Sequence, residues 1–163
     1  MRPIKQTAIG TGNTQVTQIF NRPFDPVDIC AKNISHILGR IAHLDFLNVA
    51  VSRLRPPDIL TKNAINSVDA ANSIQIEKTY ALWDEITESI GSDASGTTAA
   101  DYAKASYVLN QLYLAKFQKD FPGFKIHALS IYCENTGAEL DEAHVLVHLM
   151  NYMYLSCQIG LVP

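Results

Sequence analysis

The sequence is poor in the features that mark membrane, secreted and nucleic-acid-binding proteins. No stretch approaches the roughly 18 uninterrupted apolar residues of a membrane span, and the first residues, MRPIKQTAIGTG, lack the apolar core of a secretory signal. The 13 lysines and arginines are scattered, without the basic run or basic-aromatic patch of a nucleic-acid groove. We therefore expect neither a membrane location nor direct DNA or RNA binding.

The sequence also has few cysteines, and their arrangement matches no metal motif. Cys30, Cys133 and Cys157 are an odd number at wide spacings, so neither a disulfide framework nor a zinc site is indicated. Because no export signal is visible, reduced thiols in the cytoplasm are the simplest interpretation. We expect a cytoplasmic protein.

Signatures of catalysis are absent as well. The sequence contains no G-x-S-x-G elbow and no P-loop, and Gly10-Thr11-Gly12 lacks the third glycine and the preceding strand of a dinucleotide fingerprint. The carboxylates of Asp84, Glu85 and Glu88 share a helical stretch, for which a solvated polar face is the simpler interpretation. We expect no catalytic residues and no cofactor.

What the sequence does contain is a full apolar complement. Apolar residues make up 47 % and charged residues 18 %, a composition that argues against disorder, and 163 residues suit one domain. Residues 1–24 differ from the rest, because they are rich in Thr, Gln and Asn and show no helical stripe. The alternation over residues 14–20 is compatible with a short strand, which would need a partner. We predict a polar arm over 1–24 and a single helical domain over 25–163.

Helical periodicity covers most of residues 25–163. Asp25 and Pro26 predict a helix start, and apolar residues at spacings of three and four then continue toward Leu54. Further helices are expected over about 73–90, 98–120 and 138–158, the second opening with a capping box of Thr98 and Asp101. Residues 124–133 fit a strand or a helix equally. We predict the all-α class: an irregular bundle of four to five helices, preceded by a short polar arm with β character.

Two histidines on the last expected helix raise the question of a metal. His144 and His148 are four residues apart, and Asp141 precedes them by about one turn, so the three side chains share a face. Against a metal site, Val145 stands where HExxH has its glutamate, and no Glu-x-x-His helix is present to complete a di-iron site. Surface or interface histidines are the simpler interpretation, and a metal-binding enzyme or sensor is the alternative.

The same helix carries more apolar side chains than one buried seam requires. Apolar residues between positions 149 and 155 cover nearly the whole circumference of a helix. We predict that one side packs on the domain and the other contacts a protein partner or a second copy of the chain. The expected anchors are Met150, Tyr152, Met153 and Tyr154.

The closing run NYMYLSCQIGLVP resembles the C-terminal helical modules of bacterial ABC-three-component conflict systems, whose ends often read YMY-x-x-C-x-IG. Tyr152-Met153-Tyr154, Cys157 and Ile159-Gly160 carry the resemblance; RPPDILTKNAIN is loosely similar to segments of those modules, and AIGTGNTQV to leaders of prokaryotic effector proteins. The resemblance implies a non-enzymatic interaction module that couples a sensor or effector to an ATPase-containing anti-phage defence complex. A self-associating adaptor is the function we expect, and a viral or phage structural or inhibitor protein is a further alternative.

Overall fold

The computed structural model describes residues 25–50 and 58–163, and these residues form seven helices and no strand. The expected all-α class is confirmed for them, whereas the expected count of four to five helices is too low. The arm over residues 1–24, with its proposed β character, lies outside the described residues. The helices are α2 (Pro26–Ile41), α3 (Ile59–Ile65), α4 (Ala70–Ala81), α5 (Trp83–Gly91), α6 (Thr97–Lys116), α7 (Phe121–Thr136) and α8 (Leu140–Leu155).

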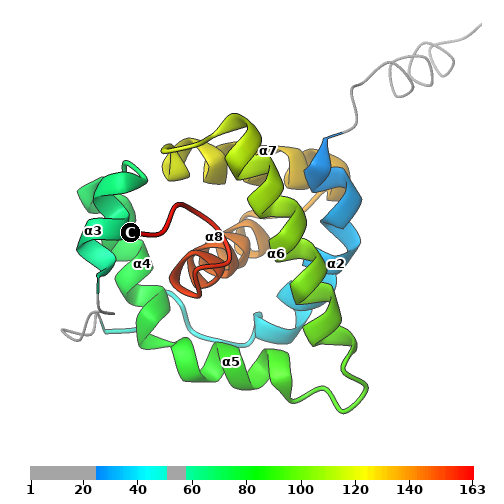
Figure 1. Cartoon of the computed structure of the whole chain (residues 1–163). Coiled ribbons are helices and arrows are strands. Elements are labelled where there is room, and N and C mark those ends of the chain that lie inside the picture. Colours follow the sequence, from blue (N-terminus) through cyan, green and yellow to red (C-terminus); the bar gives the residue numbers. More distant parts are fainter. Residues whose placement is uncertain (1–24, 51–57) are drawn as a thin grey trace, which may run out of the picture.

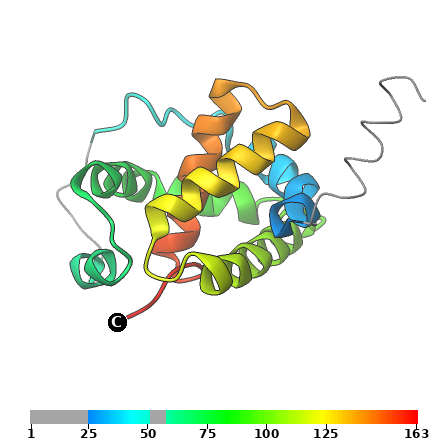
Figure 2. The same cartoon turned by 90° about the horizontal axis from the view of Figure 1, so that it is seen from above.

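The last helix, α8, is the centre of the bundle. Figure 1 shows it enclosed by α2, α4, α5, α6 and α7, and Figure 2 shows α7 lying across it. Every residue from His148 to Tyr154 is buried. A helix that is apolar on all sides is stable only where neighbours cover all sides. The buried apolar side chains of the other helices form one continuous cluster with those of α8.

The first described helix begins as the sequence predicts. The Asp25 carboxylate accepts a hydrogen bond from the Val27 amide at 3.0 Å, and the Asp28 carboxylate accepts one from the Asp25 amide at 3.3 Å, which completes a capping box. Pro26 occupies the first turn, where its missing N–H costs nothing. The apolar seam of α2 is buried from Val27 to Ile41.

The end of α2 differs from the prediction, because the helix stops at Ile41 and does not continue toward Leu54. Shortly after it, the Asp45 carboxylate accepts the backbone amides of Leu47 and Asn48 at 3.2 and 3.0 Å. Aspartate favours such local turns over helix. The turn directs Phe46 into the core, where its side chain is 3 % exposed.

The stretch expected as one helix over 73–90 is two helices. The Asp69 carboxylate caps α4 by accepting the Asn72 amide at 2.8 Å, and the backbone of Leu82, with φ −108° and ψ 19°, separates α4 from α5. The apolar stripe continues across the break, since Ile76 and Ile86 are both buried. This break accounts for part of the excess over the expected helix count.

The boundary between α6 and α7 also corrects the sequence interpretation. We expected residues near Asp120 to close one helix, but Asp120 opens α7, where its carboxylate accepts the Gly123 amide at 2.9 Å and Pro122 lies in the first turn. Residues 124–133 are therefore helical, which settles the strand-or-helix alternative. The expected capping box of Thr98 and Asp101 does not form, because Thr98 bonds to Asp93 at the start of α6.

The residues after α8 fold back against α3. The buried Asn66 side chain accepts hydrogen bonds from the Tyr113 hydroxyl at 2.5 Å and from the Leu161 amide at 2.7 Å, and it donates to the Leu161 carbonyl at 2.8 Å. Gly160 has φ +93°, and a Cβ added there would lie 2.9 Å from the ring of Tyr154. Glycine is thus required for this close approach.

Across residues 25–50 and 58–163, no helix combines the length and the apolar character needed to cross a membrane.

Candidate functional site

The four residues expected to anchor a partner are part of the chain's own core, which corrects the sequence interpretation. The exposed fractions of Met150, Met153 and Tyr154 are 0 %, and that of Tyr152 is 7 %. The Tyr154 ring stacks on Phe121 at 4.2 Å between ring centroids. The physical reason is the central position of α8, whose neighbours cover the apolar circumference that we assigned to a partner.

The polar tips of the two tyrosines are also engaged within the chain. The Tyr154 hydroxyl donates to the Asn63 side-chain oxygen at 3.1 Å, and the Tyr152 hydroxyl lies 2.8 Å from that of Thr87. Burial raises the pKa of Tyr154 well above its usual range. Both side chains therefore have their partners in this fold and contribute to its stability.

His148 is a buried structural residue. Its Nδ1 atom lies 2.7 Å from the hydroxyl of Thr79, and its ring stacks on Phe46 with 4.4 Å between centroids. Burial lowers the pKa of His148 to about 3, and the nearby charges of His144, Lys125 and Lys78 act in the same direction. The imidazole is consequently neutral at physiological pH.

The expected metal set is not assembled as three ligands. The rings of His144 and His148 lie close, with 4.8 Å between centroids, whereas Asp141 is exposed at the surface. Within the ranges that the structure describes, no group of three or more His, Cys, Asp or Glu side chains could hold a metal ion. No observation therefore favours a metal-binding function.

A buried polar chain that the sequence analysis did not identify links α4, α7 and α8. The Lys125 ammonium donates to the side-chain oxygen of Asn151 at 3.1 Å, and the Asn151 amide donates to the Thr79 hydroxyl at 3.3 Å. Burial lowers the pKa of Lys125 to about 8, partly offset by the charge of Asp69. This chain meets His148 at Thr79. Its members are buried and hydrogen-bonded to one another, so we assign it a structural role.

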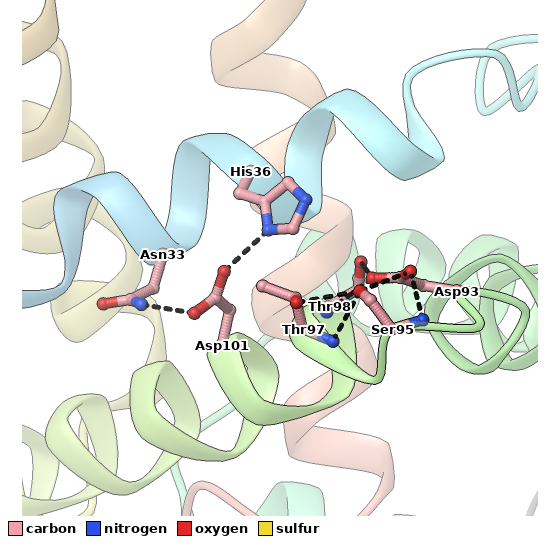
Figure 3. A network of polar contacts seen from close by, with 7 residues as sticks. All are labelled: Asn33, His36, Asp93, Ser95, Thr97, Thr98 and Asp101. Atoms are coloured by element: carbon pink, nitrogen blue, oxygen red, sulfur yellow. Dashed lines mark hydrogen bonds and ion pairs between the residues drawn. The ribbon is translucent and has the colours of Figure 1, made fainter.

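A second polar network joins α2 to the start of α6 (Figure 3). The Asp101 carboxylate accepts hydrogen bonds from His36 Nδ1 at 2.6 Å and from the Asn33 amide at 2.7 Å, and these bonds lower the pKa of Asp101. The Asp93 carboxylate accepts hydrogen bonds from Ser95 and Thr98. Because the contacts of Asp101 join α2 to α6, we assign them to helix attachment.

A polar pocket of about 560 Å³ lies between α2 and α5. It brings Glu85 and Glu88, two of the carboxylates noted in the sequence, near Arg40 and His43. Arg40 donates to the Ser92 hydroxyl at 3.5 Å. Because cationic and anionic side chains both line this pocket, its charge favours neither an anionic nor a cationic ligand.

Two further pockets, of about 410 and 560 Å³, meet at Asp141 near the start of α8. We call their combined lining the Asp141 surface. One pocket lies against the second half of α2, and the other against the end of α7. The lining residues are Ser35, Leu38, Gly39, Ala42, Cys133, Ala138, Glu139, Leu140, Asp141, Glu142, Ala143 and Val145.

The Asp141 surface is lined by apolar side chains and by carboxylates. Leu140 is 88 % exposed, the largest exposed fraction among the large apolar side chains of the described residues. Glu139 and Asp141 are exposed on either side of it, and none of the lining residues is a lysine or arginine. Glu142 is held in place by the Tyr132 hydroxyl, which donates to it and lies 2.6 Å from the Ser35 hydroxyl.

From the sequence, Asp141 was grouped with the two histidines and not with Glu139 and Leu140. The run Glu139-Leu140-Asp141-Glu142 was the available signal, since an apolar residue among carboxylates at a helix start is unexpected for a buried seam. No protein-family model, no curated protein and no solved structure matches this chain.

Proposed function

We propose that this chain is a non-enzymatic protein-interaction module that binds a basic, apolar segment of a partner protein at the Asp141 surface. The observation that supports the proposal is the combination of apolar side chains and carboxylates, without a lysine or arginine, in the lining of two adjoining pockets. Exposed apolar area rimmed by charge is characteristic of protein-binding surfaces.

The two parts of the surface have different physical roles. Covering an exposed leucine such as Leu140 contributes about 1.5–3 kcal/mol, because apolar area leaves water. The carboxylates of Glu139 and Asp141 attract a cationic segment and accelerate its association, an effect that salt weakens. A basic segment with apolar side chains satisfies both parts, whereas an acidic one is repelled.

The proposal also includes a biological role, which is based on the resemblance to bacterial ABC-three-component conflict systems. In that role the chain is a cytoplasmic adaptor of a prokaryotic anti-phage defence complex. Self-association stays a prediction. The residues that we expected to mediate it, from Met150 to Tyr154, are buried in the chain's own core. Light scattering of the purified chain measures it directly.

A binding experiment with a matched control tests the proposed surface. The probe is a fluorescent peptide with the sequence of residues 1–24, which carries three basic and no acidic residues. We expect Leu140→Lys to weaken binding of this peptide at least tenfold. Ile126→Lys introduces the same change at an apolar side chain that is 71 % exposed on α7, outside both pockets, and should alter the affinity less than twofold.

Salt and peptide composition complete this test. We expect affinity to fall as sodium chloride is raised from 50 to 300 mM, and to be lost when the apolar residues Val16, Ile19 and Phe20 of the peptide are replaced by serine. Equal binding by the Leu140→Lys and Ile126→Lys variants would reject the Asp141 surface as the binding site.

A further inference from the structure

The charges of this chain are segregated along its sequence. Residues 1–24 contain Arg2, Lys5 and Arg22 and no acidic residue. Residues 25–163 contain all 16 acidic residues and ten lysines and arginines, a net charge of −6. The N-terminal segment is therefore a cationic peptide attached to an anionic helical body, and the two attract each other.

The charge of the Asp141 surface complements this segment better than that of the pocket between α2 and α5. Its lining includes Glu139 and Asp141 and no lysine or arginine, whereas the lining of the pocket between α2 and α5 includes Arg40. The segment also contains apolar side chains that could cover the apolar lining, since Val16, Ile19 and Phe20 lie between its basic residues Lys5 and Arg22.

The attachment point allows residues 1–24 to reach this surface within one chain. They join α2 at its N-cap, Asp25, and the Asp141 surface begins farther along the same helix, between Ser35 and Ala42. At 1.5 Å per helical residue that span is about 15 to 25 Å. An extended segment of 24 residues reaches up to about 80 Å. Attachment also gives the segment an effective concentration in the millimolar range, so even a weak contact is populated.

We propose that residues 1–24 bind the Asp141 surface of their own chain and leave it when a partner supplies a stronger basic segment. This proposal rests on the proposed function, because it assumes that the surface binds basic, apolar segments. The attached segment then competes with a partner for the same surface, which we call self-competition. The apparent affinity for the partner falls in proportion to the fraction of chains whose surface is still free.

The test compares binding of the residue 1–24 peptide to two full-length chains. One is the wild type, and the other carries Arg2→Glu, Lys5→Glu and Arg22→Glu, which removes the complementary charge from the attached segment. We expect the peptide to bind the variant at least tenfold more tightly, because its surface is free. A matched control with Lys32→Glu, Lys104→Glu and Lys116→Glu, all exposed on α2 and α6, changes net charge equally and should alter affinity less than twofold.

Each outcome separates this proposal from the proposed function. Self-competition at the Asp141 surface is supported if the variant with Arg2→Glu, Lys5→Glu and Arg22→Glu binds the peptide more tightly and the added substitution Leu140→Lys abolishes this binding. Equal binding by both chains, still sensitive to Leu140→Lys, overturns self-competition and leaves the proposed function standing. Binding that is insensitive to Leu140→Lys in both chains overturns both. A tenfold difference that vanishes when the protein is diluted shows that the segment comes from a second copy, which also overturns binding within one chain.

Discussion

The Nδ1 atom of His148 and the hydroxyl of Thr79 lie 2.7 Å apart inside the bundle, and this hydrogen bond connects the central helix α8 to α4. The Thr79 hydroxyl also accepts the Asn151 amide, which in turn holds the Lys125 ammonium. A neutral histidine and a charged lysine thus belong to one buried chain of hydrogen bonds. Each responds to pH in its own window.

Acidification should destabilise the fold through His148. Its pKa is about 3 in the folded chain, against an ordinary value of 6.5, so the unfolded state binds the proton first as pH falls. The unfolding free energy should therefore decrease from pH 6.5 toward pH 3, by up to about 1.4 kcal/mol per pH unit. Urea unfolding at pH 7, 6 and 5 measures this slope. His148→Gln keeps a polar side chain without the titration and should show a shallower slope; identical slopes would contradict the assignment.

Mild alkalinisation should have the opposite effect through Lys125. Burial lowers its pKa to about 8, below the ordinary 10.5, so between these values the unfolded state holds the proton that the folded state has released. Stability contributed by this group should therefore rise as pH increases from 8 toward 10.5. The measurement is urea unfolding at pH 7.5, 8.5 and 9.5. Lys125→Met removes the titrating group, so its rise over this window should be smaller; an equally steep rise would show that other groups cause it.

Shortening Met153 should destabilise the protein without altering its oligomeric state. The side chain is completely buried in α8, and truncating a buried methionine to alanine costs about 2–5 kcal/mol through lost contacts and the cavity left behind. Chemical denaturation gives the free energy, and light scattering gives the molar mass. Leu140→Ala, at a side chain that is 88 % exposed, serves as the control and should stay within about 0.5 kcal/mol of the wild type. A change of molar mass with unchanged stability in Met153→Ala would restore the interface interpretation.

Replacing Gly160 with alanine should loosen the C-terminal segment. Its φ of +93° is unfavourable for other residues, and a Cβ there would lie 2.9 Å from Tyr154 and 3.2 Å from the Asn66 side-chain oxygen. We expect a loss of about 1–3 kcal/mol and faster hydrogen exchange at the Leu161 amide, which bonds to Asn66. The control is Gly91→Ala at the end of α5, where an added Cβ meets nothing within 4 Å. A loss no larger than that of the control would show that the turn adapts.

The sequence was sufficient for the features that depend on local chemistry. The start of α2 follows from Asp25 and Pro26, and the buried seam from Val27 to Ile41 follows from spacings of three and four. The break at Leu82 and the end of α2 at Ile41 were not predicted, because the apolar periodicity continues across both positions. The break depends on the backbone conformation of Leu82. The end of α2 is followed by a turn at Asp45, and a single aspartate in the sequence is only a weak signal for such a turn.

The site was harder to predict than the fold, because it depends on which helix lies in the centre. A helix as apolar as α8 fits either a central position or an interface, and periodicity does not distinguish them. The surrounding helices decide between the two, because they bury Tyr152 and Tyr154. Only the start of α8, at Leu140 and Asp141, stays exposed to a partner. Asp141 was singled out from the sequence only as part of the alternative metal set with His144 and His148, and not as part of an acidic surface with Glu139.

The central position of α8 has a consequence for biosynthesis. Translation proceeds from α2 to α8, so the helices that surround the core leave the ribosome before the helix they pack around. Until residues 140–155 have emerged, the buried faces of α2, α4 and α7 have no central partner. We therefore expect the buried faces of these helices to stay exposed during synthesis until α8 is available, and the bundle to form in one late step.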